Sequence, residues 1–195
     1  MKRRIATGLI CIFVSLLPAR AQNRLKELIP YTTLNAQYAG STGLVSVGIA
    51  KTSEKQLLEL GLMYGYTPAF GGDANHSLSL KLSASPSRLA IAPKLYWQPI
   101  QIGVFLCQNF GKNLGLTWDQ QYPKDYYWWN RSRRTHVFFG TQLTLDSGPG
   151  RIDKVALYME ANTNDLYISS YFPNRRTMKI RDIFFLGVGC KLLIK

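Results

Sequence analysis

The sequence predicts an all-β chain that forms an antiparallel transmembrane β-barrel of eight strands. Segments of about ten residues alternate between apolar and polar side chains, which is the pattern of strands whose two faces differ. The second face of several segments mixes charged residues with Gly, Ser and Ala, as in the water-containing interior of a narrow membrane barrel. Aromatic residues gather near the segment ends, where membrane barrels place their interfacial girdles.

Length and composition exclude several other classes. The 195 residues are enough for one domain with its own core. The 46% hydrophobic and 12% aromatic content excludes a fully disordered chain. Beyond the first twenty residues no apolar run approaches the roughly 18 residues that a spanning helix needs, which excludes a helical membrane protein.

The amino terminus has the parts of a secretory signal peptide. Basic residues 2–4 precede an apolar stretch over 5–17, and Ala19-Arg20-Ala21 supplies the small residues of a cleavage site. We expect cleavage near Ala21, so that residues 1–21 form the signal peptide and residues 22–195 the barrel domain. The alternative is an anchor helix, for which the apolar stretch is short.

The expected mature chain is strongly basic. Cleavage would remove four basic residues and leave 20 Lys and Arg against 11 Asp and Glu, a net charge of +9. A basic, aromatic chain in the cytosol would suggest a nucleic-acid partner. For an exported chain we expect no nucleic acid and instead anionic lipid head groups or phosphorylated glycolipids.

Seven segments carry the alternation. They span residues 43–51, 56–66, 76–85, 100–110, 136–145, 154–162 and 184–194. Because such barrels have an even number of strands, an eighth must close the ring. Residues 30–39 and residues 88–96, which Pro93 interrupts, are both candidates. We favour residues 30–39 because they make the short turn at Thr52 periplasmic.

Charged side chains on the polar faces predict an internal network. Glu59, Lys81, Glu160 and Lys191 all have the inward phase, and Glu160 could pair with either lysine. The alternative is a soluble sandwich or lipocalin-like barrel, a periplasmic protein that binds a small ligand. Soluble sheets favour strands of about five or six residues, so the longer alternation favours the membrane barrel.

Several short motifs are similar to those of a known group of proteins. They are Gly-Tyr-Thr-Pro at 65–68, Gly-Gly at 71–72, His-Ser-Leu-Ser-Leu-Lys at 76–81, Tyr-Pro-Lys-Asp-Tyr-Tyr-Trp-Trp at 122–129 and Asn-Asp-Leu-Tyr at 164–167. With them the chain resembles the small outer-membrane β-barrel proteins of Bacteroides-type Gram-negative bacteria, most of which have no assigned activity. The resemblance covers nearly the whole mature chain and implies location in the outer membrane. The chain departs from such barrels at its end, Leu193-Ile194-Lys195, where they often have an aromatic residue.

The best catalytic candidate is His76 with Ser77 or Ser79. Some eight-stranded barrels are lipid A deacylases with a His and a Ser two positions apart in one strand. Only residues i and i+2 share a strand face, so both serines have the opposite phase from His76. We therefore predict no catalytic residues, with a lipid A-modifying hydrolase as the enzymatic alternative. His76 and His136 form no close pair, so we predict no metal site and no cofactor.

Basic and aromatic residues mark two long connections. In the first, Trp128 and Trp129 precede Arg131, Arg133 and Arg134. Aromatic rings prefer the head-group level and guanidinium groups pair with phosphate, so this set is the candidate contact with lipopolysaccharide phosphates. The second, residues 163–182, adds Arg175, Arg176, Lys179 and Arg181. The alternative is an anchoring belt with solvated basic loops. The predicted role is that of a non-enzymatic envelope protein whose outer loops contact lipopolysaccharide or another envelope partner.

Overall fold

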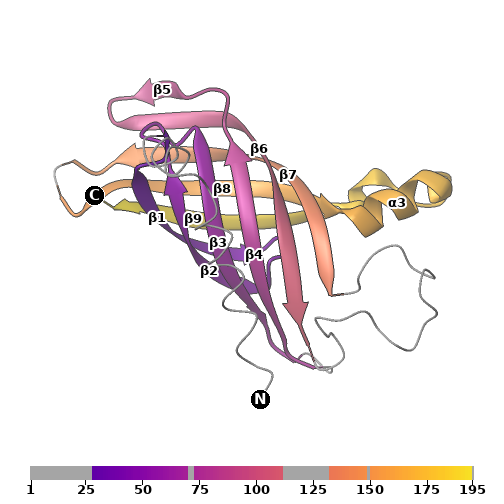
Figure 1. The fold of residues 1–195 in the computed structure, drawn as a ribbon. Helices are drawn as coiled ribbons and strands as arrows, with labels where there is room; N and C mark the ends of the chain where they lie inside the picture. Colours follow the sequence, from indigo (N-terminus) through magenta and orange to yellow (C-terminus); the bar gives the residue numbers. More distant parts are fainter. Residues whose placement is uncertain (1–27, 70–72, 112–131, 149, 195) are drawn as a thin grey trace, which may run out of the picture.

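The computed structural model describes residues 28–69, 73–111, 132–148 and 150–194. Strands dominate this part of the chain (Figure 1). In order, the elements are β1 (Tyr31–Ala39), β2 (Val45–Thr52), β3 (Leu58–Thr67), β4 (Asn75–Ala84), β5 (Leu89–Ala92), β6 (Leu95–Phe110), β7 (Arg133–Asp146), β8 (Ile152–Asn164), α3 (Asp165–Asn174), η1 (Ile180–Ile183) and β9 (Phe185–Ile194).

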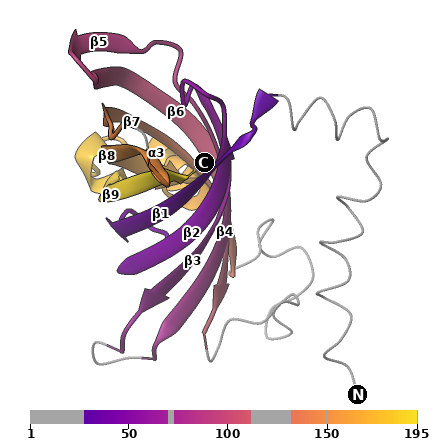
Figure 2. The same cartoon turned by 90° about the vertical axis from the view of Figure 1, so that its left-hand side faces the viewer.

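Eight of these strands close into an antiparallel barrel, and Figure 2 shows its curved wall from a second direction. Two pairings complete the ring, β1 with β9 and β4 with β6. The predicted all-β antiparallel barrel of eight strands is thereby confirmed. Residues 30–39 supply the eighth strand as β1, whereas β5, within residues 88–96, pairs with the first residues of β6.

The connections divide between two ends of the barrel. The short turns at residues 53–57 and 147–151, the β5 segment, the start of β1 and the end of β9 lie at one end, here called the turn end. The other end, here called the loop end, holds the connection at residues 40–44, residues 165–184, the end of β3 with the start of β4, and the end of β6 with the start of β7. Figure 1 shows α3 extending from the loop end, away from the carboxyl terminus.

Polarity is inverted relative to a water-soluble domain. Large apolar side chains cover the outer wall, and Leu157 is 63% and Leu186 64% exposed. The buried inward positions are mostly polar or charged, including Thr33, Asn35, Gln37, Ser46, Thr52, Glu59, Ser77, Ser79, Lys81, Gln98, Gln142, Thr144, Glu160, Asn162 and Lys191. The two-residue period of a strand thus sorts each segment into an apolar outer and a polar inner face.

The β1–β2 turn folds into the barrel at the loop end. Thr42 is 1% exposed, and its carbonyl accepts a hydrogen bond from Ser77 Oγ. Asn162 Nδ2 of β8 donates to the Gly40 carbonyl at 2.8 Å. Gly65 leaves the space that the turn occupies, because a β-carbon there would overlap the Thr42 carbonyl. The turn therefore fills this mouth of the barrel.

The β2–β3 turn also folds into the barrel, at the turn end. Gln56 has a φ of 56° and is 4% exposed, so its side chain lies inside the ring. Its side-chain oxygen accepts from Thr144 Oγ1 at 3.0 Å, and its carbonyl accepts from Gln98 Nε2 at 2.9 Å. Gln142 joins them by donating to Gln98 Oε1 at 2.6 Å.

Replacing Gly65 by Val tests the inward turn. The new side chain would push against the Thr42 backbone, and we expect a loss of about 1–3 kcal/mol in the free energy of unfolding, as for overpacked cores. Denaturant unfolding followed by circular dichroism measures the change. Gly150→Ala is the control, since its β-carbon would have no neighbour closer than 4.0 Å. Equal stability of the two variants would contradict this arrangement of the turn.

Candidate functional site

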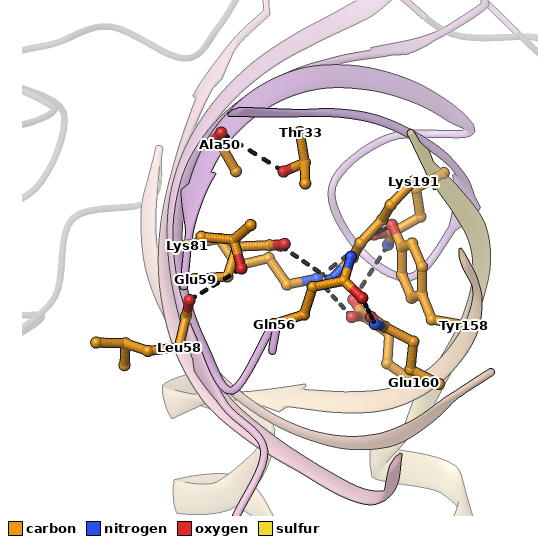
Figure 3. Close-up of polar contacts among 12 residues, drawn as sticks. Thr33, Ala50, Gln56, Leu58, Glu59, Lys81, Tyr158, Glu160 and Lys191 are labelled. Carbon is orange, nitrogen blue, oxygen red and sulfur yellow. Dashed lines mark hydrogen bonds and ion pairs between the residues drawn. The ribbon is translucent and has the colours of Figure 1, made fainter. Parts of the chain in front are cut away.

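Four charged side chains from four strands meet inside the barrel (Figure 3). Lys81 of β4 pairs with Glu160 of β8, and Lys191 of β9 lies 2.9 Å from Glu59 Oε1 of β3. All four are buried, and Glu160 is 1% exposed. The structure thus brings together the four residues of the predicted lumen network. Of the two lysines that could pair with Glu160, Lys81 forms the ion pair.

Neutral polar side chains also form hydrogen bonds with these charged groups. Gln37 of β1 donates from Nε2 to Glu160 Oε1 at 3.2 Å, so both carboxylate oxygens have partners. Its own Oε1 accepts from the Tyr158 hydroxyl at 2.8 Å and from Lys81 Nζ at 3.5 Å. Buried charges need such partners because an unpaired one carries a large desolvation cost.

Aromatic rings line the same space. Lys81 Nζ lies 4.4 Å from the Phe138 ring centroid, and Lys191 Nζ lies 4.8 Å from that of Tyr158. Gly140 and Gly187 stand opposite Glu160 on the two neighbouring strands, which leaves room for its side chain. Two lysines and two glutamates, in contact with rings and amides, therefore lie at the centre of the ring.

Two cavities open on the outside of the ring, in the wall formed by β1 and its neighbours. Two shallow depressions of about 690 and 570 Å³ share Ala36, Val47 and Cys190 among their lining residues. Ala36 and Cys190 are cross-strand partners on β1 and β9. Their side chains are smaller than those around them, so the outer surface is depressed at this point. These depressions belong to the apolar outer surface.

The His and Ser residues of the deacylase alternative lie on opposite sides of the wall. His76 faces outward, where its Nδ1 is 2.6 Å from the Tyr64 hydroxyl. Ser77 and Ser79 are 2% and 0% exposed and face the lumen. The predicted opposite phase is confirmed, so neither serine reaches His76 for proton transfer. His136 also lies inside, stacked on Phe105 with ring centroids 4.3 Å apart.

Two of the five residues of the candidate lipopolysaccharide contact, Arg133 and Arg134, belong to the part of the chain that the structure describes. Trp128, Trp129 and Arg131 lie outside the described residues. Arg133 and Arg134 begin β7 at the loop end and point to different sides of it. Arg133 is exposed and donates from Nε to Gln108 Oε1 at 3.2 Å, whereas half-buried Arg134 lies 3.9 Å from Asp165.

Residues 165–183 form a structured arm where the sequence analysis placed a loop. The arm comprises α3, a turn and η1, and it begins directly at the end of β8. Asn164 caps α3 by accepting from the Tyr167 backbone N–H at 3.0 Å, and Asp165 lies in the first turn. Asn followed by Asp is a helix-start signal that could have identified the helix. Four cations on the arm are exposed: Arg175, Arg176, Lys179 and Arg181.

Comparison with protein-family models gives no match, and comparison with curated proteins gives no significant match. Within the described part of the chain, no helix is both long and apolar enough to cross a membrane. The same residues contain no group of three His, Cys, Asp or Glu side chains arranged to hold a metal ion.

The internal ion pair can be tested with a double-mutant cycle of Lys81→Met and Glu160→Leu. Either single change leaves a buried charge without its partner, and we expect each to cost about 3–5 kcal/mol of unfolding free energy. The double variant should recover most of this loss because no charge then remains unpaired.

Denaturant unfolding of the four proteins measures the cycle. The exposed lysine variant Lys51→Met is the control and should change stability by less than about 1 kcal/mol. Strictly additive losses in the double variant would show that Lys81 and Glu160 do not interact.

Proposed function

We propose that this chain is a small outer-membrane β-barrel protein of the cell envelope, with its loop end outside the cell and with no catalytic role. The observation that carries the proposal is the inverted polarity of the barrel. Large apolar patches on a protein surface mark contact with a membrane or another protein. Here exposed apolar side chains lie on all eight strands of the ring, among them Leu34, Val47, Leu62, Leu80, Ile102, Phe139, Leu157 and Val188.

Closure and strand length also support a membrane location. A bilayer core cannot satisfy unpaired backbone groups, so only helices and closed barrels cross it. The ring has no open strand edge where β1 meets β9 or β4 meets β6. β3, β4 and β9 have 10 residues each, which matches the roughly nine to eleven of a tilted membrane-spanning strand.

The division of the connections supports the orientation. Outer-membrane barrels have short periplasmic turns and longer outer loops. The turn end carries the turns at 53–57 and 147–151. At the loop end the strands are farther apart in the sequence, since residues 111–132 separate β6 from β7 and residues 165–184 separate β8 from β9. Export through a signal peptide at residues 1–21 would deliver the chain to this membrane.

The contacts inside the ring favour a role for the loop end rather than transport. Both mouths contain an inward turn, and paired charges occupy the space between them. A diffusion pathway would need an open polar channel, as in much wider barrels. The proposed partners are outer-membrane lipid and lipopolysaccharide, with Trp128, Trp129, Arg131, Arg133 and Arg134 as the candidate phosphate contact.

Placing an arginine on the outer wall distinguishes a membrane barrel from a soluble one. Leu157 lies in the middle of β8, and Leu157→Arg should destabilise the inserted barrel by about 2–4 kcal/mol because the charge would face hydrocarbon. Ile152→Arg, at the first residue of the same strand, is the matched control and should cost about 1 kcal/mol or less near the interface.

The measurements are folding into lipid vesicles, followed by heat-dependent gel mobility, and retention in membranes after a carbonate wash. The wild-type protein should stay with the membrane. In a soluble barrel the added charge would be neutral or would improve solubility. A fully soluble wild-type protein, or equal behaviour of the two arginine variants, would overturn the proposal.

A further inference from the structure

The tip of the arm, residues 172–182, carries four exposed cations and a single carboxylate. We propose that this tip binds phosphate groups on the saccharide part of lipopolysaccharide. The inference rests on the proposed function, since it needs the loop end to face the outside of the cell. It concerns other residues than those of the candidate phosphate contact at 128–134.

The arm is mounted firmly on the barrel. α3 follows β8 without an intervening loop, and the Asn164 cap fixes its first turn. The Arg134–Asp165 ion pair and the Tyr167–Phe185 ring contact, with centroids 5.0 Å apart, hold its base. A helix of 10 residues spans about 15 Å, so the end of α3, next to Arg175 and Arg176, stands away from the rim of the barrel. A binding surface held in this way loses little conformational entropy when a ligand binds.

The charge of the tip is not neutralised by the arm itself. Arg175, Arg176, Lys179 and Arg181 face a single carboxylate, that of Asp182, and only Arg181 forms an ion pair with it among the contacts described, at 3.8 Å. In the lumen, by contrast, each lysine has a carboxylate partner. The negative end of the α3 dipole accounts for a cation at the C-cap, Arg175. It does not account for Lys179 and Arg181, which follow the helix.

The composition of the tip favours a phosphorylated glycolipid as the partner. Three of the four cations are arginines, whose planar guanidinium groups bind phosphate through two parallel hydrogen bonds. Phe172 and Ile180 are 67% and 61% exposed beside them, although they do not belong to the wall of the barrel. Apolar groups next to arginines suit a ligand that presents sugar rings and phosphates together. In the proposed orientation the arm points into the layer that these saccharides form.

The test compares two triple variants of the full chain, refolded in detergent. Arg175→Gln, Arg176→Gln and Lys179→Gln remove three charges from the tip. Lys55→Gln, Lys94→Gln and Arg151→Gln remove three exposed charges from the turn end and form the control. The probes are fluorescently labelled lipopolysaccharide and the same material after chemical removal of its phosphates, with binding measured by anisotropy.

We expect the tip variant to bind intact lipopolysaccharide at least about tenfold more weakly, and the control to stay within about twofold of wild type. Removing the phosphates should weaken wild-type binding by a similar factor and have little further effect on the tip variant. Equal losses in both variants would mean general charge attraction. Equal losses, an unchanged tip variant or indifference to phosphate would each overturn the inference.

Heat-dependent gel mobility and carbonate washing of the same proteins separate the two proposals. Both triple variants change only exposed side chains and should fold and insert as the wild type does. If the wild type does not insert, the proposed membrane location fails. If all three proteins insert but the tip variant binds as tightly as wild type, only the assignment of the tip fails.

Discussion

The closed ring of backbone hydrogen bonds is the constraint on which the rest of this structure depends. Once β1 pairs with β9 and β4 with β6, every side chain on a strand must point either into the ring or out of it. A slip of one residue in any strand would exchange its faces and place a charge such as Glu160 on the apolar wall. The strand register and the internal ion pairs therefore depend on each other.

Much of this arrangement could be predicted because alternation is a local property. The period of two identified β3, β4, β8 and β9 and placed Glu59, Lys81, Glu160 and Lys191 on one side. Which carboxylate meets which lysine could not be predicted, since the Lys81–Glu160 pair crosses the barrel between strands far apart in sequence. The inward folding of the turns also depends on such cross-barrel contacts.

Two parts of the fold, the start of β6 and helix α3, could not be predicted from the alternation of the sequence. β6 begins at Leu95, but a bulge between Gln98 and Gln101, at Pro99, shifts the phase so that both glutamines face inward. A strict period of two cannot follow such a shift, so the sequence analysis recognised the strand only from residue 100 onward. α3 was missed because a helix with no buried residue has no core-facing stripe, and only its Asn-Asp start marked it.

The four buried charges carry a desolvation cost, so their contribution to the structure needs a physical reason. Replacing a buried ion pair by apolar side chains of similar volume is often neutral or stabilising, so stability alone does not explain four such groups. In the proposed membrane setting their contribution lies in the difference between the two faces of each strand. Neutral residues such as Gln37 and Ser79 already distinguish the inner face. Glu59, Lys81, Glu160 and Lys191 enlarge that difference, because a charge turned toward hydrocarbon costs more than one paired in the lumen.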